Sequence, residues 1–165
     1  MKMLRIGLAV LAATLLVGCS EPKFQKYNGP EVTRIVLFKE DLRMHLMHGD
    51  KVLTSYDVDL GFQPKGAKQF EGDGKTPEGR YLIDRRNPRS SFYLSIGLNY
   101  PNRRDVEYAR SQGKKPGGDI FIHGQATGPN RSGENWTAGC IAVTNPEMRE
   151  IYAMVQEGVP IDIYP

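Results

Sequence analysis

Short apolar runs, each ended by a turn-forming residue, recur along most of the chain and limit the folds open to it. Within these runs apolar and polar residues alternate, or β-branched residues dominate, as in half-buried and buried strands. Glycine and proline between the runs favour turns, and the chain has 18 glycines and 11 prolines. The predicted strands are 32–38, 42–47, 52–60, 80–84, 92–96, 119–123 and 159–163.

One helix is strongly indicated near the C-terminal end of the sequence. Asn145 is a candidate cap and Pro146 occupies the favoured first position, while Met148 and Ile151 begin a helical spacing of apolar residues. A shorter helix is predicted within 102–112. We therefore expect a β-rich α+β domain with one main helix packed on its sheet.

Size and charge exclude several classes of protein. With 165 residues the chain has room for one ordinary domain. Its 39% hydrophobic content excludes a disordered chain, and the absence of a long apolar or heptad pattern excludes a multi-span membrane protein and a coiled coil. A net charge of +3, from 22 basic and 19 acidic residues, is too small to indicate nucleic-acid binding.

The first 20 residues have the pattern of an export signal. A short basic segment precedes an apolar run at 6–17, which is too short to span a bilayer as a helix. The following Gly18-Cys19 resembles a bacterial lipobox, in which cleavage precedes a cysteine that then receives lipid. Ser20 resembles the pattern of lipoproteins sent to the outer membrane, whereas an ordinary secreted protein with a stray cysteine is the alternative. The predicted organisation is a lipoprotein signal peptide at 1–18, the lipidated Cys19 with a tether at 19–31, and one folded domain at 32–165.

A lipidated Cys19 would leave Cys140 as a lone thiol in an oxidising compartment. Such a thiol cannot form an internal disulfide, so it is either a small buried residue or a reactive one. Cys140 follows the small residues Ala138 and Gly139 and precedes an apolar run. A turn of this kind exposes both a side chain and backbone amides, and the amides of Gly139 and Cys140 could stabilise an oxyanion.

A thiol nucleophile needs a base, and the chain has three histidines. His123 ends an apolar strand, whereas His45 and His48 belong to a hairpin where we expect them to be solvated. A zinc site built from these residues is disfavoured, because His45 and His48 would not point together and no Cys-x-x-Cys pair supports it. A Gly-x-Ser-x-Gly serine nucleophile is also missing from the sequence.

Three motifs resemble the YkuD-type L,D-transpeptidase catalytic domain. They are Gly-Asp-Ile-Phe-Ile-His-Gly at 118–124, Thr-Ala-Gly-Cys-Ile at 137–141, and Gly-Asp-Gly-Lys-Thr-Pro-Glu-Gly-Arg-Tyr at 72–81. The resemblance extends over almost all of the predicted domain, and the Trp-Thr-x-Gly-Cys-Ile-Ala-Val form is similar to the YafK-like branch. It implies a YkuD-like fold with mixed sheets at 32–165.

The resemblance implies cysteine-dependent acyl transfer on peptidoglycan stem peptides. Cys140 would be the nucleophile and His123 the proton donor and acceptor. The backbone carbonyl of Gly124 would orient the imidazole, and the Gly139 amide would contribute to the oxyanion hole. No metal or organic cofactor is expected. The alternatives are a hydrolase on the same scaffold (an L,D-carboxypeptidase, or an amidase that releases a wall-linked lipoprotein) and a non-catalytic peptidoglycan-binding lipoprotein.

Two positions depart from the common family motif Ser-His-Gly-Cys-Ile-Arg. Ala138 replaces a second histidine, and Ala142 replaces an arginine that would lie near the substrate. Since stem peptides carry carboxylates, another cation is expected, and Arg131 is our candidate. Thr137 and Trp136 are further candidates for substrate contact.

The expected partners and location follow from the same patterns. They are peptidoglycan stem peptides, a wall-linked lipoprotein as a further partner, and the membrane through the lipid anchor, with no nucleic acid. The expected location is the periplasm, with the lipid anchor in the outer membrane.

Overall fold

The computed structural model describes residues 22–125 and 135–165, and strands dominate this part of the chain. The strands are β1 (Arg34–Phe38), β2 (Arg43–His48), β3 (Lys51–Asp57), β4 (Gly79–Asn87), β5 (Ser95–Leu98), β6 (Phe121–His123), β7 (Ile141–Ala142) and β8 (Pro160–Tyr164). They form one sheet in the order β3-β2-β1-β8-β4-β5-β6-β7. The pairs β1–β8 and β6–β7 are parallel and the other neighbours antiparallel, so the sheet is mixed.

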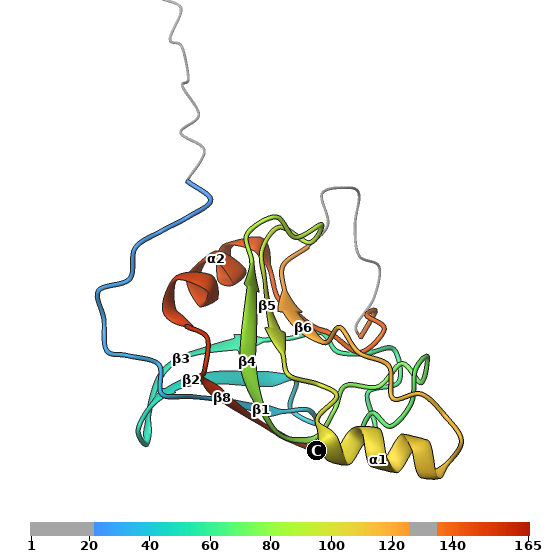
Figure 1. Ribbon diagram of the computed structural model, residues 1–165. Coiled ribbons are helices and arrows are strands. Elements are labelled where there is room, and N and C mark those ends of the chain that lie inside the picture. The colour runs from blue at the N-terminus through green and yellow to red at the C-terminus, as the bar shows by residue number, and fades with distance from the viewer. Residues whose placement is uncertain (1–21, 126–134) are drawn as a thin grey trace, which may run out of the picture.

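The sheet curls, so that β4 and β5 run across the direction of β1 and β2 (Figure 1). Alternation sets the inner face, because Ile35 and Leu37 of β1 and Met44 and Leu46 of β2 are fully buried. Strand β8 connects the two halves of the sheet, since it pairs in parallel with β1 on one side and antiparallel with β4 on the other. The curled sheet therefore encloses one continuous hydrophobic core.

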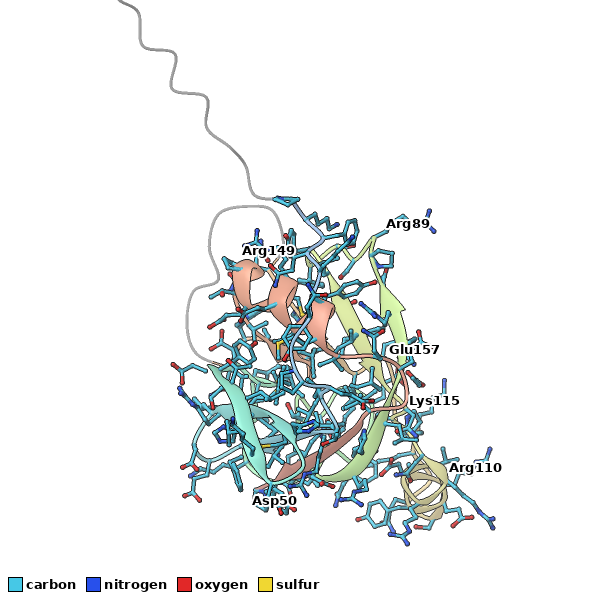
Figure 2. All side chains as sticks on the ribbon, turned by 90° about the vertical axis from the view of Figure 1, so that its left-hand side faces the viewer. Asp50, Arg89, Arg110, Lys115, Arg149 and Glu157 are labelled. Atoms are coloured by element: carbon cyan, nitrogen blue, oxygen red, sulfur yellow. The ribbon has the colours of Figure 1, made fainter. Side chains whose placement is uncertain are left out.

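Two helices accompany the sheet, and they contribute to the core unequally. Helix α2 (Asn145–Met154) packs against β5 and buries three side chains, Met148, Ile151 and Met154. Helix α1 (Arg103–Ser111) buries only Ala109, and its Arg110 projects away from the core (Figure 2). The predicted β-rich α+β class with one main helix is confirmed.

The cap of α2 differs from the prediction by one residue. Thr144 caps the helix, and Glu147 completes a capping box by accepting from the Thr144 backbone amide at 2.8 Å. Asn145 instead accepts a hydrogen bond from the backbone amide of Gln125 at 2.7 Å. Its side chain therefore connects the start of α2 to the segment that follows β6.

Several strand boundaries differ from the predicted ones, and at two of them the backbone enters the left-handed region. Tyr93 has a φ of 72°, so β5 begins at Ser95 rather than at 92. Asp119 has a φ of 55°, so β6 begins at Phe121. The run predicted at 52–60 ends as a strand at Asp57, and beyond it Asp59 forms only an isolated bridge with Ala142. Within the described residues, no helix is long and apolar enough to cross a bilayer.

Candidate active site

The turn before β7 is held together by the Thr137 hydroxyl. This hydroxyl donates to the Cys140 carbonyl at 2.7 Å and accepts from the Gly139 amide at 3.1 Å. The Thr137 amide also donates to the Leu60 carbonyl at 3.1 Å, which fixes the turn to the segment after β3. Thr137 is 5% exposed and its hydroxyl is engaged within the turn, so this side chain helps to shape the turn. Its predicted contact with a substrate stays a prediction.

The Gly139 amide, which was predicted to contribute to the oxyanion hole, also donates a hydrogen bond within the turn. A hydrogen bond already given to the Thr137 hydroxyl leaves this N–H unavailable to an oxyanion in this conformation. By contrast, the Cys140 amide has no hydrogen-bond acceptor among the described residues. The amide that remains open to a ligand is therefore that of the cysteine itself.

Gly139 is required by both the conformation and the packing of the turn. Its φ is +135°, and a Cβ at this position would lie 2.6 Å from the Lys75 carbonyl oxygen. We expect Gly139→Ala to lower the free energy of unfolding by about 3 kcal/mol or more, measured by denaturant titration. Gly49→Ala is the matched control, because Gly49 also has a positive φ but nothing within 4 Å, and we expect it to cost only about 1 kcal/mol. Equal losses in the two variants would contradict the packing argument.

Cys140 places its sulfur between two backbone groups of the segment that leads into β6. The half-buried thiol donates to the Asp119 carbonyl at 3.3 Å. Burial, and to a smaller extent the charge of Asp119, raises the pKa of this thiol above its ordinary value. The Phe121 backbone amide and the charges of Lys68 and Arg85 offset part of that rise. The sulfur therefore rests as a neutral thiol that a base must activate.

A neutral resting thiol at Cys140 should react slowly with alkylating reagents. We expect iodoacetamide to modify Cys140 slowly at about pH 7 and faster as the pH rises, with a midpoint above that of a free cysteine. The measurement is the rate of Cys140 alkylation against pH, followed by peptide mass mapping. A midpoint below about pH 7 would contradict a neutral resting thiol, since it would indicate a preformed thiolate.

His123 is held in one orientation at the end of β6. Its ring is 3% exposed, and its Nδ1 lies 2.6 Å from the Gly124 carbonyl oxygen. Because a carbonyl only accepts, Nδ1 carries the proton, and in the neutral ring Nε2 is then the acceptor. Gly124 has no room for a side chain, since a Cβ there would lie 2.5 Å from Asn145 Oδ1.

Two aromatic rings surround the imidazole. Phe92 lies with its ring centroid 4.5 Å from that of His123, and the Trp136 ring lies 5.7 Å away, edge-on. The Trp136 indole N–H donates to Asp59 Oδ2 at 3.2 Å, which fixes the indole in place. Trp136 thus packs beside the imidazole. Its predicted contact with a substrate stays a prediction.

Strand pairing brings the histidine and the cysteine to one pocket. β6 and β7 are parallel neighbours, with Ile122 opposite Ile141 and His123 opposite Ala142. A cavity of about 300 Å³ opens beside them. Its lining residues are Asn87, Ser90, Ser91, Phe92, Ser95, Asp119, Phe121, His123 and Cys140.

The comparisons with known proteins show the family of this chain. The model of the YkuD family, described as the L,D-transpeptidase catalytic domain, matches residues 32–163. This chain belongs to the YkuD family. Among curated proteins it is similar to the "Putative L,D-transpeptidase YafK" of Escherichia coli (strain K12), at 32% identity over 144 residues, covering 79% of this chain and 53% of that protein. The chain thus spans about half the length of the curated relatives that it matches.

Solved structures show the same domain. The helical cell shape determining protein Pgp2 from Campylobacter jejuni has a TM-score of 0.63 and 29% identity, over 83% of this chain and 49% of that one. An L,D-transpeptidase of Enterococcus faecium has a TM-score of 0.53 over 82% of this chain and 50% of its own. At 16% identity this second likeness shows the fold alone. The predicted membership in the YkuD family and in its YafK-like branch is confirmed.

The pocket that His123 and Cys140 line also includes residues that no sequence pattern had indicated. Asp119 and Phe121 lie within a quoted motif, but nothing in the pattern indicated that they would border the thiol. Phe92, Ser90 and Ser91 come from the connection between β4 and β5, and Ser95 is the first residue of β5. Neither segment carries a chemical motif. Of the predicted site residues, Cys19 and Arg131 lie outside the described residues.

No metal-binding group is present in the part of the chain that the structure describes. Three or more His, Cys, Asp or Glu side chains do not come together there in a way that could hold an ion. His45 Nδ1 lies 2.6 Å from Ser55 Oγ, and His48 Nδ1 lies 2.8 Å from the Glu31 carbonyl oxygen. Both belong to β2 and have partners away from the pocket.

Proposed function

We propose that this protein is a cysteine acyltransferase that acts on peptidoglycan stem peptides through a Cys140 thioester. The observation that carries the proposal is that Cys140 and His123 line one pocket, with the imidazole fixed by the Gly124 carbonyl. Membership in the L,D-transpeptidase family supplies the reaction class. Because this substrate is part of the cell wall, the proposed reaction takes place at the cell wall.

The first half-reaction forms the thioester. The thiol proton passes from Sγ to Nε2 of His123, and the thiolate attacks the carbonyl carbon of the L,D peptide bond after the third stem residue. The Cys140 amide is the donor available to the oxyanion that forms. When the intermediate collapses, the C–N bond breaks and His123 returns the proton to the leaving D-alanine amine.

The second half-reaction decides between transfer and hydrolysis. An amine that attacks the thioester gives its proton to His123, forms a new amide and breaks the C–S bond, and the proton then restores the thiol. Water in place of the amine gives a free carboxylate and makes the protein a hydrolase. Both outcomes use the same residues, so only the products distinguish them.

We further propose that the protein works at the cell wall from a lipid anchor. Support comes from the lipobox-like Gly18-Cys19 and from Ser20, which favours an outer-membrane anchor in the periplasm. Pgp2, a structural neighbour at 29% identity, is a helical cell shape determining protein. A role in wall remodelling and cell shape is therefore part of this proposal.

Product analysis tests the reaction. The full chain would be incubated with purified tetrapeptide muropeptides, a free diamino acid and a lysine-containing lipoprotein peptide, and the products resolved by mass spectrometry. Cross-linked or exchanged products with release of D-alanine are expected. Cleavage without a new amide bond would replace the transferase proposal with a hydrolase. Unchanged substrate together with retained wall binding would favour the non-catalytic lipoprotein.

A further inference from the structure

The Arg85 side chain extends across the neighbouring strand β5, because the residue opposite it on that strand is a glycine. Arg85 of β4 lies opposite Gly97 of β5, and Gly97 lies opposite Phe121 of β6. A Cβ at Gly97 would lie 2.6 Å from both Cγ and Nε of Arg85. The arginine side chain therefore occupies the space that any other residue at 97 would fill.

Across that gap the guanidinium reaches the border of the thiol pocket. Arg85 Cζ lies 4.6 Å from the centroid of the Phe121 ring, and Nη2 lies 3.5 Å from Asp119 Oδ1. Phe121 and Asp119 both line the pocket with Cys140. The positive charge is thus held at the border of the thiol pocket by packing against the Phe121 ring and over Gly97 of β5.

The ion pairs of Arg85 leave it available to a ligand. Its Nη1 donates to Asp84 Oδ1 at 3.1 Å, and its other partner is Asp119. The side chain of Asp119 is 92% exposed and that of Arg85 is 40% exposed, so solvent screens this pair and a ligand carboxylate can replace it. A guanidinium can then bind the carboxylate through two parallel N–H donors.

The other cation that acts on the Cys140 thiol is Lys68, which is buried and paired within the fold. Lys68 is 6% exposed, and its Nζ donates to Asp73 Oδ1 and to the Phe70 carbonyl, each at 2.9 Å. At the position where the common family motif has arginine, this chain has Ala142, which is 1% exposed. Of the two cations that act on the thiol, Arg85 is therefore the one placed to meet a charged substrate group at the border of this pocket.

We propose that Arg85, laid across Gly97, binds a carboxylate of the acyl-donor peptide and sets the enzyme's preference for charged stems. This inference rests on the proposed acyl-transfer function. Arg85 acts on substrate binding, and Gly97 acts as a positioning residue for it.

Steady-state kinetics on a panel of donors test this role. The donors are a tetrapeptide stem and forms in which each carboxylate in turn is replaced by an amide. We expect Arg85→Gln to lower kcat/KM on the unmodified stem by about 10- to 100-fold, mainly through KM. For one amide form, wild type and Arg85→Gln should be equal, which identifies the carboxylate bound. Arg85→Lys should lose less, because it keeps the charge but not the paired donors.

Gly97→Ala provides a second variant that leaves Arg85 in the chain. Its methyl group would displace the Arg85 side chain, so it should reproduce the selective loss, and adding Arg85→Gln should cause no further loss. Arg110→Gln removes the same charge from an exposed position of α1 and should leave kcat/KM unchanged (Figure 2).

Two results would overturn the role of Arg85. One is an unchanged kcat/KM in Arg85→Gln on the unmodified stem. The other is an equal loss on every donor, which would indicate a general structural effect. A wild-type protein that is inactive on all donors would instead refute the proposed function itself.

Discussion

Cys140→Ala is expected to abolish release of D-alanine from tetrapeptide stems, with a loss in kcat of about 10⁴-fold or more. The reason is chemical, because no other described residue in the pocket can form the thioester on which both half-reactions depend. The measurement is the rate of D-alanine release, followed by chromatography or mass spectrometry.

The controls for this variant separate chemistry from folding. Cys140 is only half-buried and its thiol donates one hydrogen bond, so we expect the thermal midpoint to change little. Cys140→Ser keeps the size and the hydrogen bond to Asp119 but replaces the sulfur with a much weaker nucleophile, so it should also be inactive. Turnover by Cys140→Ala near the wild-type rate would show that the nucleophile lies elsewhere.

His123→Gln is expected to lower kcat by about 10²- to 10⁴-fold, because the thiol then has no base. Glutamine is chosen to retain polar bulk between the Phe92 and Trp136 rings, since alanine would leave a cavity beside them. The variant should lose activity at every pH, while alkylation of Cys140 at high pH should persist. This combination distinguishes loss of the base from loss of the pocket.

His48→Gln is the matched control for the imidazole. His48 is exposed on β2, and its ring nitrogen contacts the Glu31 backbone rather than the pocket. We expect wild-type kcat and KM from it. Activity that falls equally in His48→Gln and His123→Gln would contradict the assignment of His123 as the base.

Local sequence patterns predicted most of the fold because they report local preferences. The alternation in 42–47 and the proline at the start of α2 each have a direct structural cause, and both elements are present. The errors occur where a neighbour in space decides. Asn145 is as good a cap as Thr144 by type, but its side chain is taken by Gln125, which follows a different strand. Likewise, residue type does not indicate the left-handed backbone at Tyr93, and it indicates that at Asp119 only weakly.

The candidate site was predictable only in part, because contacts between distant segments of the chain place some of its residues. Cys140 and His123 stand out by their own chemistry and by the motifs around them. Arg85 does not, since its relation to the thiol depends on two strand registers and on a glycine between them. The sequence also did not indicate that the Thr137 hydroxyl would hold its own turn together through the Cys140 carbonyl and the Gly139 amide.

Intact-protein mass spectrometry during turnover tests the thioester most directly. The full chain would be mixed with an excess of tetrapeptide stem, quenched in acid, and compared with Cys140→Ala treated in the same way. The account predicts a mass increase equal to the stem acyl group without its terminal D-alanine, located at Cys140 and absent from the variant. An adduct at another residue, or turnover by wild type with no adduct at any quench time, would contradict a Cys140 thioester.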